Sequence, residues 1–369
     1  MIWLFAPFLP KIAGDEVKKV IDSGMINRGK VAEEFEKLLR EKYGFFLVHT
    51  VNSCTSALRL SLLAAGVKPG DEVLSTPWSM IATNTAILEC GAKPIFVDIE
   101  YDSLNMDPMK IEERIKERTK AIMVVHYAGY PANMAAIYKI AHQRGLEVIQ
   151  DCAHAMGAQH RGRNIGAFGK YCCFSFQAIK TITMGDGGAI STTDEDVYND
   201  VVKRSWFGID KKLRVKTPYG AFPTEIDTLG FKNNITDIDA ALGLVGLKNI
   251  DYALNKRRGI AEEYNEEFQD LDKVKLPVYA PFNQSAWWLY PIHVKDRDSF
   301  AKFMGDNQIQ VDKHNERNDK YKIFGGIDPS LEITRRVDED IIHIPLHASL
   351  TPEEVAFIIK KVKEWDKIA

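Results

Sequence analysis

Apolar and polar positions along the chain predict strands and helices in alternation. Short apolar runs typical of buried strands cover residues 45–50, 72–76, 94–99, 120–126, 146–150, 171–176 and 188–192. Longer stretches with helical spacing lie at residues 31–44, 52–66, 80–91, 106–118 and 131–145. This alternation predicts an α/β domain in which a mainly parallel, seven-stranded sheet carries helices on both faces.

Two parts of the chain break the alternation. Residues 1–30 carry turn residues at Gly24, Asn27 and Gly29 and are predicted to be irregular. Residues 206–230 form a long polar stretch with several aromatic side chains, which we expect to be a loop. Long loops without secondary structure are uncommon unless they are functional, so we expect this one to serve a site.

The C-terminal part of the chain predicts a smaller domain. Residues 236–268 have helical spacing and would link the two domains. A strand and two amphipathic helices are predicted after them, at residues 287–294, 296–308 and 351–365. We expect a large domain over residues 1–245 and a smaller α+β domain over residues 246–369, with the N-terminal segment able to join the smaller domain.

The composition excludes several classes of protein. The chain has 369 residues and a net charge of −3 with both signs interspersed, which indicates neither a nucleic-acid nor a membrane-surface partner. No stretch is long and apolar enough to span a bilayer, and the N-terminus lacks the features of a signal peptide. The cysteines lie in apolar runs without metal-ligand spacing, at Cys54, Cys90, Cys152, Cys172 and Cys173. We therefore expect free thiols, no metal site and a cytoplasmic location.

Candidate chemistry gathers between residues 150 and 191. Asp151 ends one strand-like run, and a second run leads to Lys180 and then to a Gly-rich turn at residues 185–188. An enzyme that uses pyridoxal phosphate (PLP) needs such a pair: the lysine amine forms a Schiff base with the aldehyde, and the acid pairs with the protonated pyridine nitrogen. Taken singly, each residue has an ordinary alternative, a helix cap for Asp151 and a solvated side chain for Lys180.

The pattern resembles the DegT-type family of PLP-dependent sugar aminotransferases over nearly the whole chain. Asp151 and His154 are similar to the D-x-x-[QH] box of the family, and the stretch from Phe174 to Lys180 is similar to its F-S-F-x-x-x-K box. The turn at residues 185–188 is similar to its G-[ED]-G-G turn. The resemblance implies the fold type I aminotransferase architecture, PLP as the cofactor, and Lys180 and Asp151 as the catalytic residues.

The resemblance also implies how the cofactor phosphate is held. Residues 53–56 are similar to the phosphate loop of the family, so the amides of Cys54 and Thr55 and the Thr55 hydroxyl are expected to meet the phosphate. Cys54 stands where Gly or Ala is commoner. Ser175 resembles a second phosphate ligand. An ordinary helix cap remains the alternative for the loop.

The residue expected to cover the cofactor ring departs from the family pattern. Met80 stands where an aromatic residue is usual, although a thioether can cover a ring face. Trp78 could stack on the ring instead, and either residue could simply belong to the core. His154 resembles the residue on the other ring face or near the phenolic oxygen, with a packed, hydrogen-bonded histidine as the alternative.

Residues 230–237 resemble a family box that reaches across a dimer to the partner's cofactor phosphate. The resemblance carries Lys232 and Asn234 over as cofactor-binding residues and implies a homodimer with shared active sites. The alternative is a helix entry capped near Thr236.

Other residues resemble parts of the family that lie near the sugar. Arg28 could meet a substrate phosphate. His314, Asn318 and Asp319 would sit where the small domain closes on the sugar nucleotide. Residues 126–134 resemble members that aminate C-4 of a 4-keto sugar. Solvated surface positions are the alternative for each.

The resemblance implies transfer of the amino group of glutamate to a keto group of a nucleotide-linked keto-deoxy sugar, with 2-oxoglutarate released. We favour C-4 of the sugar over C-3. Some relatives are PLP-dependent sugar dehydratases with His in place of the Schiff-base lysine, and the presence of Lys180 argues against that class. A non-catalytic role on an inherited fold is the remaining alternative.

Overall fold

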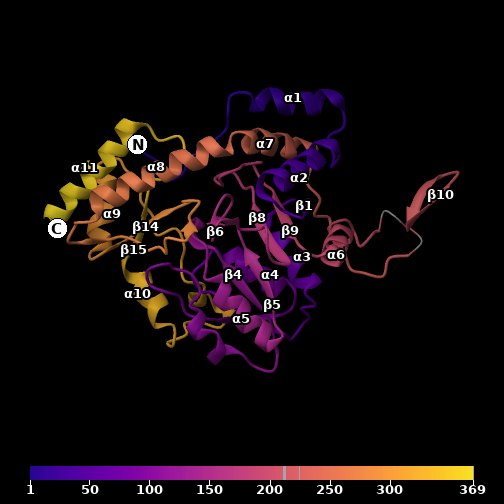
Figure 1. Cartoon of the computed structure of the whole chain (residues 1–369), viewed down its shortest axis with the longest axis horizontal. Coiled ribbons are helices and arrows are strands. Elements are labelled where there is room, and N and C mark those ends of the chain that lie inside the picture. Colours follow the sequence, from indigo (N-terminus) through magenta and orange to yellow (C-terminus); the bar gives the residue numbers. More distant parts are fainter. Residues whose placement is uncertain (211–212, 224, 369) are drawn as a thin grey trace.

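The computed structural model describes residues 1–210, 213–223 and 225–368, and a seven-stranded sheet lies at its centre (Figure 1). The strand order is β1-β9-β8-β5-β4-β2-β3. β9 is antiparallel to both of its neighbours, and the other pairs are parallel. The strands are β1 (Leu47–Val51), β2 (Glu72–Ser75), β3 (Lys93–Phe96), β4 (Thr119–Val125), β5 (Glu147–Asp151), β8 (Tyr171–Ser175) and β9 (Gly188–Thr192). The predicted mainly parallel sheet is confirmed.

Helices cover both faces of this sheet because successive side chains of a strand point to opposite faces. Cys172 and Phe174 of β8 pack into a core with residues of α2 and α7. Tyr171 and Cys173 of the same strand pack on the other face, against α3, α4 and α6. The helices are α2 (Lys30–Tyr43), α3 (Cys54–Ala64), α4 (Ile81–Glu89), α5 (Met134–Arg144), α6 (Glu195–Ser205) and α7 (Asp237–Lys248).

A second apolar core lies in the C-terminal part of the chain. It is formed by a three-stranded antiparallel sheet, β12-β14-β15, and three helices. These elements are β12 (Val274–Lys275), β14 (Tyr290–Val294), β15 (Ile341–Ile344), α8 (Ile250–Phe268), α9 (Arg297–Asp306) and α11 (Pro352–Ile368). Helix α10 (Glu332–Asp340) precedes β15, and a small sheet joins β6 (Gln159–His160), β7 (Arg163–Asn164) and β13 (Asn283–Gln284). The placement of the domain boundary between residues 245 and 246 stays a prediction.

Predictions about local structure were wrong at three places, the first two of which are residues 1–30 and 106–118. Residues 1–30 are not wholly irregular, because α1 (Ala13–Ser23) forms there and lies along α7 (Figure 1). Its acidic first turn favours a helix start, and Gly24, at φ +69°, ends it. Residues 106–118 form two short 3-10 turns, Pro108–Lys110 and Glu112–Arg114, where a helix was expected. The backbone at Ile115 is already extended, which stops a longer helix.

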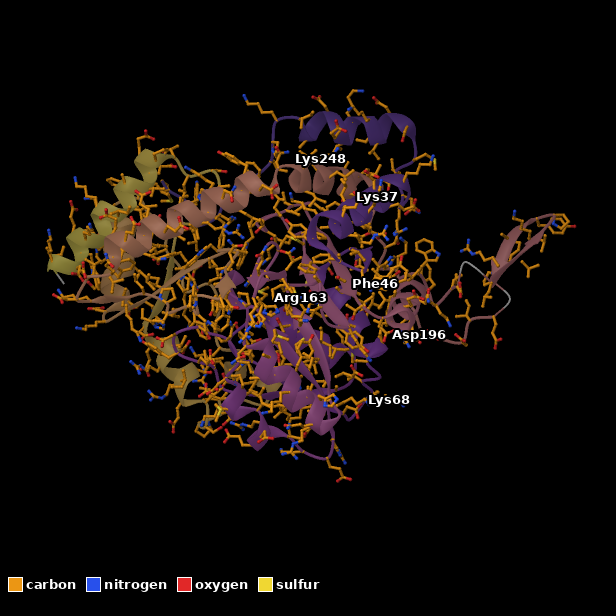
Figure 2. All side chains as sticks on the ribbon, in the orientation of Figure 1. Lys37, Phe46, Lys68, Arg163, Asp196 and Lys248 are labelled. Carbon is orange, nitrogen blue, oxygen red and sulfur yellow. The ribbon has the colours of Figure 1, made fainter. Side chains whose placement is uncertain are left out.

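The polar stretch at residues 206–230 is not all loop. It contains a hairpin of β10 (Arg214–Thr217) and β11 (Gly220–Pro223) that projects from the body of the chain (Figure 1). Figure 2 shows its side chains standing clear of the rest of the molecule, and Tyr219 is 91% exposed. No helix among the described residues is long and apolar enough to cross a membrane.

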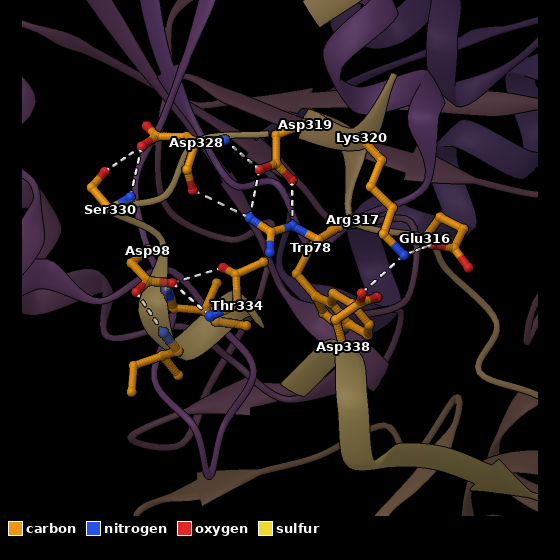
Figure 3. A network of polar contacts seen from close by, with 12 residues as sticks. Trp78, Asp98, Glu316, Arg317, Asp319, Lys320, Asp328, Ser330, Thr334 and Asp338 are labelled. Carbon is orange, nitrogen blue, oxygen red and sulfur yellow. Dashed lines mark hydrogen bonds and ion pairs between the residues drawn. The ribbon is translucent and has the colours of Figure 1, made fainter. Parts of the chain in front are cut away.

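A buried polar network fixes the segment before α10 (Figure 3). The Arg317 guanidinium donates to both carboxylate oxygens of Asp319, at 2.7 and 2.5 Å, and both side chains are almost fully buried. The Asn318 backbone amide donates to the Pro77 carbonyl at 2.8 Å, and the Asn318 side chain donates to the Ser79 carbonyl at 2.8 Å. The side chains of Asn318 and Asp319 are therefore occupied within the chain, where we had expected them near a sugar nucleotide.

We expect Asp319→Ala to lower the free energy of unfolding by about 3 kcal/mol, because it leaves the Arg317 charge buried without the carboxylate that pairs with it. Urea unfolding followed by circular dichroism measures this change. Asp306→Ala is the matched control, since it removes an exposed ion pair with Lys302 and should change the free energy by less than about 1 kcal/mol. Equal effects of the two variants would contradict the account.

Candidate active site

A cavity of about 330 Å³ lies where the carboxyl end of β5 meets the starts of α3 and α4 and the segment after β8. In an α/β sheet this edge is where ligands usually bind. The structure brings eight of the residues predicted from the sequence to the cavity wall: Cys54, Thr55, Met80, Asp151, His154, Ser175, Lys180 and His314.

The Asp151 carboxylate is buried and held by short contacts. One oxygen accepts a hydrogen bond from the Thr83 hydroxyl at 2.7 Å, and the other accepts from the Ala153 amide at 3.0 Å. The Cys54 thiol lies 3.9 Å from the second oxygen. Burial raises the pKa of Asp151, and the hydrogen bonds from Thr83 and Ala153 oppose that rise. Thr83 was not predicted to have a role.

The Lys180 amine faces the same cavity. Burial lowers its pKa to about 7, and the nearby Asp151 charge opposes the lowering. A substantial fraction of this amine is therefore uncharged at neutral pH, as a nucleophile requires. Its nitrogen lies 3.5 Å from the centre of the Trp288 ring, within cation–π distance.

Aromatic side chains from the C-terminal part of the chain close the cavity. The His154 imidazole stacks on Trp288, with ring centroids 3.7 Å apart and an angle of 17°. Burial holds the pKa of His154 well below its usual value and lowers the pKa of His314 to about 3, so both rings are neutral at pH 7. His314 has φ +65°, a left-handed conformation uncommon for histidine. Nδ1 of His154 has no hydrogen-bond partner among the described residues.

The start of α3 offers backbone donors to the cavity. Ser53 caps the helix by accepting from the Ser56 amide at 3.1 Å, which leaves the amides of Cys54 and Thr55 at an open helix N-terminus. Gly188, at the end of the Gly-rich turn, lies directly against the start of α3. A methyl group on Gly188 would lie 2.6 Å from the Cys54 amide nitrogen and 2.5 Å from the Ser53 carbonyl carbon. Ser175, at the end of β8, lines the same cavity.

The two candidates for covering a cofactor ring lie in different places. Met80 is 54% exposed and lines the cavity. Trp78 is fully buried in a core with Tyr127 and does not line the cavity. The tryptophan that does line the cavity is Trp288, which was not predicted to have a role. The paired tryptophans before β14 were the signal for it, but they were assigned to a strand.

Three predicted residues, Arg28, Lys232 and Asn234, do not line this cavity within one chain. Arg28 and Asn234 line another hollow, of about 310 Å³, beside Trp206. The Lys232 amine donates to the Asn234 side chain and lies over the Trp206 ring. The Arg28 guanidinium forms an ion pair with Glu36 at 2.8 Å.

The cavity residues fit PLP. A phosphate would meet free amides at a helix N-terminus, in a cradle that only glycine at position 188 leaves open. A protonated pyridine nitrogen suits the buried Asp151 carboxylate, and an aldehyde suits an amine with a lowered pKa. The unpartnered nitrogen of His154 remains available to a polar group of the cofactor.

Fold and cavity together define a PLP-dependent enzyme of fold type I. The sequence matches the model of the DegT/DnrJ/EryC1/StrS aminotransferase family over residues 11–363, and the chain belongs to this family. Members of the family depend on PLP, so the predicted aminotransferase activity and the predicted cofactor are confirmed.

Individual relatives agree with this assignment. The chain is 31% identical over 376 residues to the spore coat polysaccharide biosynthesis protein SpsC of Bacillus subtilis, covering 98% of this chain and 97% of SpsC. Its fold is similar to that of the sugar aminotransferase CalS13 from Micromonospora echinospora, at a TM-score of 0.93 and 30% identity, with 99% and 100% of the two chains covered. AtS13 from Actinomadura melliaura also gives a TM-score of 0.93, at 32% identity, with 99% and 98% covered.

We expect Gly188→Ala to weaken PLP binding and to cost about 1–3 kcal/mol of stability, because the added methyl group forces the turn away from the start of α3. PLP titration and urea unfolding measure the two effects. Gly259→Ala, in α8 with open space around it, is the control and should be neutral or stabilising by up to about 1 kcal/mol. Unchanged PLP affinity in Gly188→Ala would place the phosphate elsewhere.

Proposed function

We propose that this enzyme transfers the amino group of glutamate to the C-4 keto group of a nucleotide-linked keto-deoxy sugar, through PLP held by Lys180 and Asp151. The observation that carries the proposal is that a buried amine and a buried carboxylate face one cavity at an open helix N-terminus. The relationship to SpsC and CalS13 supports a sugar as the amino acceptor. The preference for C-4 over C-3 rests on the sequence resemblance of residues 126–134 and 314–319.

Each cavity residue has a separate task in this proposal. Bound PLP supplies an electron sink that stabilises negative charge at the carbon that loses its proton. The Lys180 nitrogen removes the proton from Cα of glutamate and later returns a proton to the acceptor carbon, as general base and then acid. The Asp151 carboxylate, fixed by Thr83, keeps the pyridine nitrogen protonated. The amides of Cys54 and Thr55, with Ser175, bind the phosphate.

The remaining side chains would bind or orient the reactants. Met80 and His154 both line the cavity, and in this proposal they cover the two faces of the cofactor ring. His314 also lines the cavity, and in this proposal its neutral ring hydrogen-bonds the sugar. Trp288 lies against both His154 and the Lys180 amine, so it helps to exclude water from the amine.

We propose that the active enzyme is a cytoplasmic homodimer, in which Lys232 and Asn234 of each chain complete the partner's cofactor site. Two observations support a contact between chains near these residues. Asn234 and Arg28 lie apart from the Lys180 cavity, and large apolar side chains are exposed beside them, with Met25 74% and Ile26 50% exposed. The cysteines are unpaired, which fits a reducing compartment.

The visible absorption spectrum tests the role of Lys180. Wild-type protein with added PLP should show the band of lysine-bound cofactor, and glutamate should bleach it. Lys180→Ala should lack the band because the nucleophile is gone. Lys170→Ala is the control, since Lys170 is a half-exposed residue that pairs with Glu147 and Asp194 at 3.9 and 3.7 Å, and it should behave like wild type. A band that survives in Lys180→Ala would contradict the assignment.

Mixing two inactive variants tests the shared site. Lys180→Ala and the double variant Lys232→Ala/Asn234→Ala should each lose most activity alone. After unfolding and joint refolding, about half of the dimers are mixed and each has one intact site of two, so about one quarter of wild-type activity should return. If both sets of residues act within one chain, the mixture stays inactive. Size-exclusion chromatography checks that dimers re-form.

A further inference from the structure

Trp288 connects three parts of the molecule at the cavity wall. Its indole N–H donates to the Ile179 carbonyl at 3.2 Å, one residue before the reactive lysine. Its backbone amide donates to the Ala128 carbonyl at 2.8 Å, after β4. Phe5, from the N-terminal segment, stacks on it with ring centroids 5.5 Å apart. These contacts give the ring, which is 1% exposed, a fixed orientation.

The faces of this ring carry His154 and the Lys180 amine. The imidazole is stacked at 3.7 Å, and the amine nitrogen lies 3.5 Å from the ring centre. The ring therefore contacts the Lys180 amine through its face and the backbone of the preceding residue, Ile179, through its N–H. A cation over a desolvated tryptophan face is stabilised more than one over phenylalanine.

A buried arginine holds the backbone of this tryptophan. Arg257 of α8 is 3% exposed and donates from one nitrogen to the carbonyls of Trp287, Trp288 and Leu346, at 3.2, 3.1 and 2.8 Å. Within the described residues it forms no ion pair with a carboxylate. These hydrogen bonds fix the backbone on which Trp288 stands, and they offset part of the cost of burying the Arg257 charge.

We propose that Trp288, braced by Arg257, is a positioning residue that holds the Lys180 amine over its ring and stabilises the charged form of that amine. The inference deepens the proposed function, since it takes Lys180 as the reactive lysine. The amine lies over the ring and at the cavity wall, where an aldehyde can reach it. Burial and the positive charge of Arg257 push the amine toward its neutral form, and the Asp151 carboxylate opposes them. In this proposal the Trp288 ring adds to the effect of Asp151, and the four together set the balance near neutrality.

Competitive labelling of the full-length protein, stripped of PLP, tests the proposal. Acetic anhydride reacts with the uncharged amine, and peptide mass spectrometry follows Lys180 alone as the pH is raised. We expect the labelling midpoint to fall by about one pH unit in Trp288→Leu, because the charged amine loses its partner. Trp288→Phe keeps an aromatic ring that binds a cation more weakly, and it should give a smaller fall in the labelling midpoint. Trp287→Leu removes the neighbouring ring, which packs on Tyr290 instead, and should leave the midpoint unchanged.

The direction of the shift decides the outcome. A loose or wetter cavity would raise the midpoint, so a raised or unchanged midpoint in Trp288→Leu overturns the proposal, as does an equal fall in Trp287→Leu. If Trp288→Leu does not fold, as judged by circular dichroism, Trp288→Phe decides in the same way. The labelling needs no cofactor. A protein without the PLP band that still shows the shift would contradict the proposed function and leave the role of Trp288 standing.

Discussion

The burial of two opposite charges against one cavity is the constraint on which the rest of the structure depends. An amine and a carboxylate are costly to remove from water unless each is held by specific partners. Asp151 meets this cost through hydrogen bonds from Thr83 and from the Ala153 amide. Lys180 meets it through the Trp288 face and through a lowered pKa, which leaves much of the amine uncharged. The hydrogen bonds that stabilise the buried Asp151 carboxylate and the lowered pKa of Lys180 also suit the two groups to the proposed chemistry.

The two apolar cores act together at this point. The parallel sheet delivers Asp151, the open end of α3 and the segment with Lys180 to a single edge. The C-terminal part of the chain adds Trp288, which packs in a separate apolar cluster with Trp78 and Tyr127, and His314 to the wall of the same cavity. Buried polar contacts fix the backbone near both residues. Arg257 hydrogen-bonds the Trp288 carbonyl, and the ion pair of Arg317 with Asp319 lies a few residues after His314. The site therefore depends on how the two cores are joined as well as on the sheet.

The sequence predicted best what neighbours along the chain determine. Strands β5 and β8 are apolar runs with clear ends. Asp151 lies at the end of the first and Lys180 lies shortly after the second, so both could be recognised as candidates. The cap at Ser53 is equally local.

Trp288 could not be predicted in the same way, because its contact with Lys180 joins residues far apart in sequence. The motif at residues 314–319 did not reveal which way its side chains point. In the structure Asn318 and Asp319 are buried, and Asn318 hydrogen-bonds the backbone of Ser79. The hairpin of β10 and β11 was missed because a polar two-stranded ribbon has no apolar face to reveal its period.

The most direct test of the account is to trap the cofactor on the protein. PLP is added to the wild-type chain, borohydride reduces the lysine-bound form to a stable amine, and peptide mass spectrometry locates the added mass. The account predicts one molecule of cofactor per chain on Lys180, with a loss of labelling when inorganic phosphate or glutamate is added in excess. A label on another lysine, or one spread over the surface lysines, would contradict the claim that the buried amine beside Trp288 is the reactive group of this enzyme.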